Sequence, residues 1–273
     1  MTDRYAVIGN PIAQSKSPFI HTMFARACGQ DLVYDKLECP LDGFSAAVED
    51  FRAAGGRGLN VTAPFKLQAL AIATRAQDAA RQAGAANTLR FVDDGIEAEN
   101  FDGLALVRDL VHNHACPIAG KRVLLLGAGG AVRGALRPML AEGPARLVVV
   151  NRTIDKARAV VGELGHEPRA AWCGYAELGD ERFDLVVDGT SASLHGELPP
   201  LGASAFAPGA LAYEMVYGKG LTPFLALARR AGVVRLADGV GMLVEQAAEA
   251  FNWWRGVRPR TQPVIEALTV PLD

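Results

Sequence analysis

The sequence has few cysteines and no long apolar run. Its four cysteines, Cys28, Cys39, Cys116 and Cys173, include no CxxC pair, and its five histidines show no metal-ligand spacing. We therefore expect neither disulfides nor a metal site. No apolar stretch approaches the roughly 18 residues of a membrane-spanning helix, and the first expected strand begins at Tyr5, which leaves no room for a signal peptide. These absences favour a cytoplasmic protein.

The sequence also has no excess of one charge. Its 28 Lys and Arg residues against 30 Asp and Glu residues give a net charge of -2. It contains no basic tract and no basic run interleaved with aromatics, as nucleic-acid surfaces require. We expect small-molecule ligands, no nucleic-acid or membrane partner, and a monomer or homodimer.

The chain is long enough for two domains. It has 273 residues, half of them hydrophobic, with no internal repeat and no low-complexity linker. In the N-terminal part, expected strands alternate with expected helices, and a turn signal at Asp93-Asp94-Gly95 predicts a hairpin over 87–100. Such alternation predicts a mainly parallel sheet. The strands are expected at 5–9, 32–39 and 58–62, and the helices at 17–29, 42–55 and 64–74.

A second alternating series follows an expected helix at 102–114. Its strands are continuous apolar runs, which is typical of strands buried on both faces of a parallel sheet. A last helix at 236–256 carries an apolar stripe. The fold class is therefore α/β with two α/β domains meeting across a cleft. The strands of the second series are expected at 123–127, 147–151, 185–189 and 210–216.

The segment VLLLGAGGAVRGALRPML, 123–140, reads as a strand, a glycine turn and a helix. Gly127 permits the tight turn, and Gly129 and Gly130 let backbone N–H groups approach a pyrophosphate at the helix start. Val132 stands where a third glycine or an alanine is usual, although Gly134 leaves space nearby. The segment predicts a dinucleotide site, with an ordinary strand-to-helix turn as the alternative.

The end of the next strand indicates which dinucleotide binds. An NAD site would carry Asp or Glu there, whereas this chain has Asn151, Arg152 and Thr153, with Lys156 one turn further on. The Arg152 guanidinium is suited to a 2′-phosphate. We therefore expect NADP, the alternative being a solvated Arg-Lys pair at a helix start.

Two serines precede the first expected helix in NPIAQSKSPFIH, 10–21. In extended backbone Ser15 and Ser17 face one side and Lys16 the other, so both hydroxyls can contact one ligand. A helix start also stabilises a carboxylate or phosphate. The alternative is that Ser17, followed by Pro18, only caps the helix.

Further polar residues stand at strand ends and helix starts, where an α/β sheet opens its ligand crevice. Asn60 and Thr62 share a face of a strand end, and Lys66 lies in the helical turn that follows Pro64. A cation at a helix start opposes the helix dipole, which suggests another task, although it could be a solvated lysine.

Two more polar residues have ordinary structural alternatives. Asp102 precedes GLALVRDL and could be a helix N-cap. Gln246 lies at the edge of the apolar stripe of the last helix and could be a boundary residue. Their occurrence together with the other polar groups favours a ligand site.

Several motifs together carry a resemblance. The chain resembles the shikimate dehydrogenase family over essentially its whole length, which implies NADPH-dependent reduction of 3-dehydroshikimate to shikimate in the pathway to chorismate and the aromatic amino acids. It also implies a substrate domain at 1–102, completed by 238–273, and a Rossmann NADP domain at 103–237. The motifs are VIGNPIAQSKSPFIH, GLNVTAPFK, AGAANTL, ENFDG, LLLGAGGAVRGAL, VNRT, YEMVYGKGLTPFL and DGVGMLVEQAAEAF.

The resemblance implies roles for individual residues. Lys66 and Asp102 look like the catalytic pair, and no metal is implied. The implied substrate contacts are Ser15, Ser17, Asn60, Thr62, Lys66, Asn87, Asp102, Tyr217 and Gln246. The implied NADP contacts are Gly127, Ala128, Gly129, Gly130, Ala131, Asn151, Arg152, Thr153, Lys156, Met215 and Gly239.

The chain departs from the family pattern at two places. Phe101 stands where threonine is more frequent, and Asp188-Gly189 where Asn-Ala is commoner, so Asp188 adds a negative charge near the expected cofactor. One alternative function is a quinate/shikimate dehydrogenase with relaxed cofactor use, against which Arg152 argues. Another is a non-catalytic NADP-binding sensor, against which Lys66 and Asp102 argue. The pattern leaves open which of those two residues is the formal proton donor.

Overall fold

The computed structural model describes residues 2–272, and these form two compact units. The first contains the chain up to Asp102 together with Val244–Val264. The second contains Gly103–Leu243 and the chain from Ile265 onward.

The first unit is built on a six-stranded mixed sheet with the order β2-β1-β3-β5-β6-β4. Three strands are parallel, and a hairpin of two strands continues the sheet through an antiparallel contact with β3. The predicted α/β class and the hairpin at the sheet edge are confirmed. The strands are β1 (Asp3–Gly9), β2 (Leu32–Glu38), β3 (Gly56–Val61), β4 (Arg75–Ala76), β5 (Thr88–Val92) and β6 (Gly95–Glu99).

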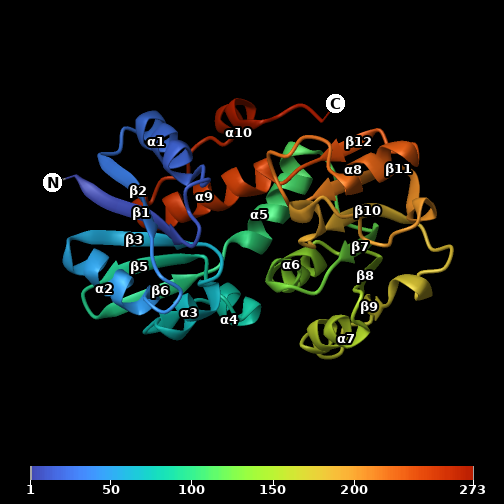
Figure 1. Cartoon of the computed structure of the whole chain (residues 1–273), viewed down its shortest axis with the longest axis horizontal. Coiled ribbons are helices and arrows are strands. Elements are labelled where there is room, and N and C mark those ends of the chain that lie inside the picture. Colours follow the sequence, from blue (N-terminus) through green and yellow to red (C-terminus); the bar gives the residue numbers. More distant parts are fainter. Residues whose placement is uncertain (1, 273) are drawn as a thin grey trace. The chain divides into compact units, whose positions relative to one another are not determined.

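Helices cover both faces of this sheet (Figure 1). On one face, the rings of Phe44 and Phe65 stack within a core shared with Leu59. On the other, Tyr5 stacks on Trp254, which lies near the end of α9 (Val240–Arg255). The first core is covered by α2 (Phe44–Ala53), α3 (Lys66–Ala71) and α4 (Asp78–Ala83), and the opposite face by α1 (Ser17–Cys28) and α9 (Val240–Arg255).

Two of the expected helices differ in detail in the structure. Lys16, not Ser17, occupies the N-cap of α1, and no side chain makes a capping hydrogen bond there. The helix expected at 102–114 is α5 (Asp102–Arg108) followed by a π-helical turn, Asp109–Asn113. The Asp109 carboxylate is fully buried there and accepts hydrogen bonds from the Tyr213 hydroxyl and the Asn113 amide.

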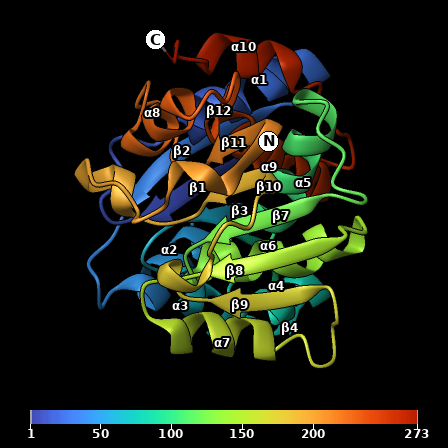
Figure 2. The same ribbon diagram turned by 90° about the vertical axis from the view of Figure 1, so that its right-hand side faces the viewer.

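The second unit contains a six-stranded parallel sheet with the order β12-β11-β10-β7-β8-β9. Figure 2 shows these strands side by side. The chain winds outward in both directions from β7, so the carboxyl ends of β7 and β10 form a topological switch point, where such sheets bind ligands. The strands are β7 (Arg122–Leu126), β8 (Arg146–Val150), β9 (Ala170–Cys173), β10 (Phe183–Asp188), β11 (Phe206–Glu214) and β12 (Arg235–Ala237).

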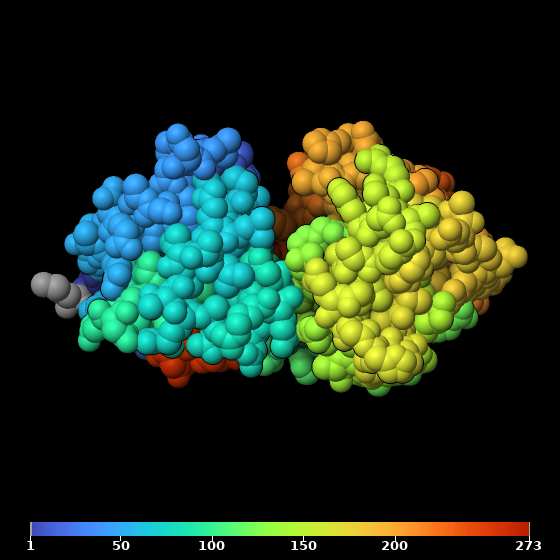
Figure 3. Space-filling model, turned by 90° about the horizontal axis from the view of Figure 1, so that it is seen from below, coloured from blue at the N-terminus to red at the C-terminus, as the bar shows by residue number. Residues whose placement is uncertain are grey.

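Both faces of this sheet are buried, as the apolar strands predict. Val123 and Leu125 of β7 belong to the core beneath α5 and α6, whereas Leu124 and Leu126 belong to the core beneath α8. The surface of α7 contributes to the face in Figure 3. The remaining helices are α6 (Gly130–Ala141), α7 (Ile154–Gly162), α8 (Pro223–Arg230) and α10 (Gln262–Leu268), and the 3-10 turns are η2 (Tyr175–Glu177), η3 (Ala192–His195) and η4 (Ala203–Ala205).

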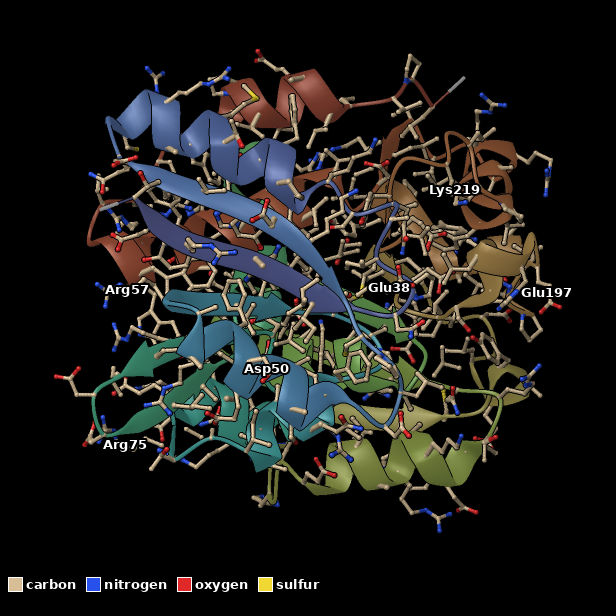
Figure 4. The ribbon with its side chains drawn as sticks, turned by 60° about the vertical axis from the view of Figure 1, so that its left-hand side comes forward. Glu38, Asp50, Arg57, Arg75, Glu197 and Lys219 are labelled. Atoms are coloured by element: carbon tan, nitrogen blue, oxygen red, sulfur yellow. The ribbon has the colours of Figure 1, made fainter. Side chains whose placement is uncertain are left out.

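The charged side chains labelled in Figure 4 lie outside these cores. Arg57 and Arg75 lie at the outer edges of the first unit, and Glu197 and Lys219 lie on loops of the second. Across residues 2–272, no helix combines the length and apolar character needed to cross a bilayer.

Candidate functional site

An ion pair joins two elements of the first unit. The Lys66 Nζ, at the first residue of α3, lies 2.5 Å from Asp102 Oδ2, at the first residue of α5. The Lys66 side chain is 33% exposed and that of Asp102 is 15% exposed, so the pair is partly desolvated yet open to a ligand. Because Asp102 bonds to Lys66, its carboxylate does more than cap a helix.

The Asn87 amide holds this pair in place. Its Nδ2 donates to Asp102 Oδ1 at 2.8 Å, while its Oδ1 accepts from the Thr88 hydroxyl at 2.9 Å and from the Phe101 N–H at 3.1 Å. Asn87 is buried, and these bonds fix which end of the amide faces Asp102. Phe101, which departs from the family pattern, therefore contributes to this network through its backbone N–H, which any residue except proline would provide at this position.

Asn60 continues this network along the sheet. Its Nδ2 donates to Thr88 Oγ1 at 3.1 Å, and its Oδ1 accepts from the Tyr34 hydroxyl at 2.7 Å. The Tyr34 ring stacks on His21 with centroids 4.1 Å apart. Burial lowers the pKa of His21 to about 3, so the imidazole is neutral.

The two serines lie at the other end of the same network. Ser15 Oγ donates to Ser17 Oγ at 3.2 Å and accepts from the Ser17 N–H at 3.3 Å, so the hydroxyls do lie together. Burial raises the pKa of Tyr34, and a hydrogen bond with Ser17 partly offsets that rise. A continuous set of polar contacts thus runs from the serines through Tyr34 and Asn60.

The other expected substrate residues lie in three places. Thr62 directly follows β3, and its N–H donates to the Ile8 carbonyl. Gln246 is half-buried on α9, within the first unit. Tyr217 follows β11 in the second unit, where burial raises its pKa.

A cavity of about 420 Å³ opens at the switch point of the second unit. Gly127 has a φ of 102°, which favours glycine, and its N–H donates to the Val150 carbonyl of β8. α6 begins at Gly130, so its first free N–H groups face the turn. Seven of the expected cofactor residues line the cavity, namely Gly127, Ala128, Gly129, Asn151, Arg152, Thr153 and Lys156.

Two cationic side chains that line this cavity, Arg152 and Lys156, are available to bind an anion. Arg152 and Lys156 are exposed, and neither forms an ion pair with another residue in the part of the chain that the structure describes. The Asn151 amide donates to the Thr153 carbonyl at 2.8 Å and so shapes the turn before α7. This arrangement suits a 2′-phosphate.

Val132 fits at the position where the dinucleotide motif usually has glycine or alanine. Its side chain is fully buried, and a Cβ on Gly189 would lie 2.6 Å from Val132 Cγ2, so Gly189 provides the space. A Cβ on Gly103 would lie 2.2 Å from the Gly134 carbonyl oxygen, which brings α5 and α6 into backbone contact. The expected space at Gly134 is therefore filled by another helix.

The remaining expected cofactor residues lie close to the cavity. A Cβ on Gly239 would lie 2.1 Å from the Met215 carbonyl oxygen, so these two residues are in direct contact. Gly130 and Ala131 form the first turn of α6.

Several residues near both sites were missed from the sequence. Tyr34 contacts Asn60, whereas Tyr175 and Thr190 line the cavity. Each lies far along the chain from its partners, and tyrosine or threonine alone carries no spacing signal. Among the described residues, no group of three or more His, Cys, Asp or Glu side chains is placed to hold a metal ion.

Three family descriptions match parts of the chain. The shikimate dehydrogenase substrate binding domain matches residues 7–89, shikimate/quinate 5-dehydrogenase matches 109–195, and the shikimate 5'-dehydrogenase C-terminal domain matches 239–269.

Curated relatives match over nearly their full length. The shikimate dehydrogenase (NADP(+)) of Aromatoleum aromaticum is 55% identical, with 99% of this chain and 98% of that protein covered. The protein of the same name from Halorhodospira halophila is 54% identical, with 99% of each chain covered.

Solved structures share the fold. An Ael1 enzyme from Pseudomonas putida has a TM-score of 0.96 at 57% identity, covering 99% of this chain and 100% of that one. Shikimate 5-dehydrogenase of Thermus thermophilus, in complex with NADP(H) and shikimate, has a TM-score of 0.87 at 30% identity, covering 97% and 98%.

Proposed function

The chain belongs to the shikimate dehydrogenase family, and from this membership we propose that Lys66 and Asp102 carry its proton chemistry. The enzyme catalyses the NADPH-dependent reduction of 3-dehydroshikimate to shikimate, a step toward chorismate and the aromatic amino acids. The single observation that carries the proposed site is the 2.5 Å ion pair between Lys66 and Asp102, held by Asn87. The first unit is the substrate domain and the second the NADP domain.

The residues of the second unit fit NADP. The free N–H groups at the start of α6 and the close approach permitted by Gly129, which has no atom within 4 Å of its Cβ position, suit a pyrophosphate. Arg152 and Lys156 would hold the 2′-phosphate by charge-assisted hydrogen bonds. The bound nicotinamide supplies the hydride. No acidic side chain stands where NAD would require one.

Ketone reduction places negative charge on the substrate oxygen. The Lys66 ammonium can donate a hydrogen bond to that oxygen and supply or relay the proton. The Asp102 carboxylate orients the ammonium through Oδ2, and it can accept from a neighbouring substrate hydroxyl. Asn87 keeps the other carboxylate oxygen fixed, so Asp102 does not rotate away when the charge develops.

The remaining polar groups of the first unit bind substrate. Ser15 and Ser17 present two hydroxyls to the substrate carboxylate at the start of α1. Asn60, Thr62 and Gln246 contact ring hydroxyls. Biosynthesis with NADPH is consistent with the cytoplasm as the location.

Replacement of Lys66 tests this proposal. Lys66→Met keeps the stem and removes the ammonium, so kcat should fall by about 10² to 10⁴, with a smaller change in the shikimate KM. Asp102→Asn should act similarly, and the double variant should lose far less than the product of the two effects because the residues act together. Initial rates of NADP reduction by shikimate give these values.

Lys36→Met is the matched control, because Lys36 is exposed on β2 and bonds only to the Ala13 carbonyl. Its kcat should equal that of the wild type. A Lys66→Met enzyme with normal kcat at saturating substrate, under conditions where chemistry limits the rate, would make Lys66 a binding or surface group only.

A further inference from the structure

Two carboxylates are buried side by side in the second unit. Asp188 ends β10 and Glu214 ends β11, and the two residues are register partners on neighbouring parallel strands. Partners of this kind lie about 4.8 Å apart at the backbone, with side chains on the same face of the sheet. Neither residue exposes any surface. Two acidic side chains are thus buried next to each other at the switch point, away from solvent.

The partners of this pair include no cation. Asp188 Oδ1 accepts from the Thr190 N–H at 2.8 Å, and the Thr190 side chain also acts on the carboxyl group and lowers its pKa. The buried Oδ2 makes no hydrogen bond of good geometry among residues 2–272. Glu214 Oε2 accepts from the hydroxyls of Ser193 at 2.6 Å and Thr222 at 3.1 Å. Its Oε1 accepts weakly, at 3.4 Å, from the Val216 N–H.

The charged groups around the pair do not compensate it. Tyr175, on η2, is the titratable neighbour of Asp188, and burial, followed by the charge of Asp188, raises the pKa of that tyrosine. Arg152 acts on Tyr175 from the cavity side, and His195 lines the same cavity. No described Lys, Arg or His lies within ion-pair distance of Asp188 or Glu214. Two buried negative charges without a cation are strongly unfavourable.

We propose that Asp188 and Glu214 share one proton at neutral pH and that the pair is a positioning element of the cofactor site. A protonated carboxyl group carries an O–H donor and no charge, so a single proton on the pair leaves one buried charge instead of two. The same behaviour is known for carboxylates that share a site. Burial raises the pKa of Asp188 to about 6, and burial and the charge of Asp188 raise the pKa of Glu214 to about 7.

The pair is connected to the cofactor cavity through the backbone that follows it. The Met215 N–H donates to the Asp188 carbonyl at 2.9 Å, and the Gly189 N–H donates to the Leu126 carbonyl at 3.0 Å. A Cβ on Gly127 would lie 3.2 Å from Thr190 Cγ2, so this backbone packs directly against the glycine turn. The segment 189–192 lines the cavity.

A second negative charge on the Asp188 and Glu214 pair, next to the segment 189–192 that lines the cavity, would therefore repel a bound phosphate. This consequence rests on the proposed NADP site, and it predicts that NADP affinity falls as the pH rises above about 7, when the shared proton is lost. The effect on folding does not depend on NADP. Both folded-state pKa values are raised, so the unfolded chain ionises first and stability falls as the pH rises from about 4 through about 7.

Asp188→Asn tests both consequences. The amide is isosteric and its Oδ1 still accepts from the Thr190 N–H, but it carries no charge at any pH. Without ligand, the melting temperature of the variant should exceed that of the wild type by about 2 °C or more at pH 8, and the gap should close toward pH 5. Calorimetric NADP titrations should show the variant binding about threefold or more tighter relative to the wild type at pH 8.5 than at pH 6.5.

Each outcome decides the proposal. An Asp188→Asn protein that is less stable than the wild type by the same margin at every pH would show that Asp188 is an ionised acceptor throughout. That result would overturn the proposal of a shared proton. The expected stability profile with an unchanged NADP affinity ratio would overturn the link to the cofactor. If the wild-type protein does not turn over shikimate, the enzyme assignment is overturned, whereas the expected pH profile of stability stays the same.

A second variant guards against misfolding. Glu214→Gln removes the other carboxyl group, and the infrared band of a protonated carboxyl group in the wild type at pH 6.5 should weaken in this variant, because burial raises the pKa of the remaining Asp188 only to about 6. A wild-type spectrum without that band would overturn the proposal even if both variants fail to fold.

Discussion

At the residue scale, the cofactor site depends on side chains that keep their charges available. Arg152 and Lys156 carry exposed cations at the start of α7, and the turn before them is held by the Asn151 amide. In the first unit the opposite holds, because Lys66 is already paired with Asp102. Arg152 and Lys156, unpaired among the described residues, are therefore suited to binding an anionic ligand. Lys66, which Asp102 orients, is suited to donating a proton.

Replacing Arg152 tests the choice of NADP. Arg152→Asp removes a charge-assisted contact worth roughly 1.5 to 3 kcal/mol and adds repulsion, so the KM for NADP should rise at least about tenfold. The shikimate KM should change little. Initial rates at varied NADP measure the effect.

Arg158 provides the control for that change. It lies on α7, the helix that follows Arg152, pairs with Asp155 at 3.3 Å and lies over the Trp172 ring, so Arg158→Asp should leave the KM for NADP close to normal. An Arg152→Asp enzyme that binds NADP normally would contradict the assignment of Arg152 to the 2′-phosphate.

At the scale of elements, the start of α1 shows how a local pattern can mislead. Ser17 followed by Pro18 predicts a capping serine, yet Lys16 takes the N-cap and the Ser17 N–H is satisfied by Ser15 Oγ. The Ser17 hydroxyl is thereby available to Tyr34 and to a ligand. The serine pair at this helix start stays a predicted contact to the substrate carboxylate.

Alanine at both serines should weaken substrate binding. Ser15→Ala with Ser17→Ala removes two hydrogen bonds to a charged carboxylate, so shikimate affinity should fall by very roughly 2 to 4 kcal/mol while NADP affinity is kept. Calorimetric titration with each ligand measures both. Normal shikimate affinity with a lowered melting temperature would mean that the serines only stabilise the helix start.

The sequence predicts long, periodic elements better than short ones. The buried strands and long helices follow from apolar periodicity, whereas β4, α4, β9 and β12 have only two to six residues each and carry no resolvable pattern. The π-helical turn after Arg108 depends on buried Asp109, whose partner Tyr213 lies 104 residues away. Tyr34 and Tyr175 escaped prediction for the same reason, since tertiary contacts alone define their roles.

At the scale of the whole molecule, each unit has its own sheet, its own core and its own share of the chemistry. The ion pair, the serines and the amide network belong to the first unit, and the glycine turn with its cations belongs to the second. Substitutions in the two units should therefore alter substrate and cofactor parameters separately.

The most direct test of the account is one matrix of initial rates, with shikimate and quinate each assayed against NADP and NAD. We predict the highest kcat/KM for shikimate with NADP, with NAD disfavoured at least about tenfold because the Arg152 contact is lost. Comparable kcat/KM values with NAD, or faster turnover of quinate, would contradict the assigned specificity, and no turnover of any pair would contradict the enzyme itself.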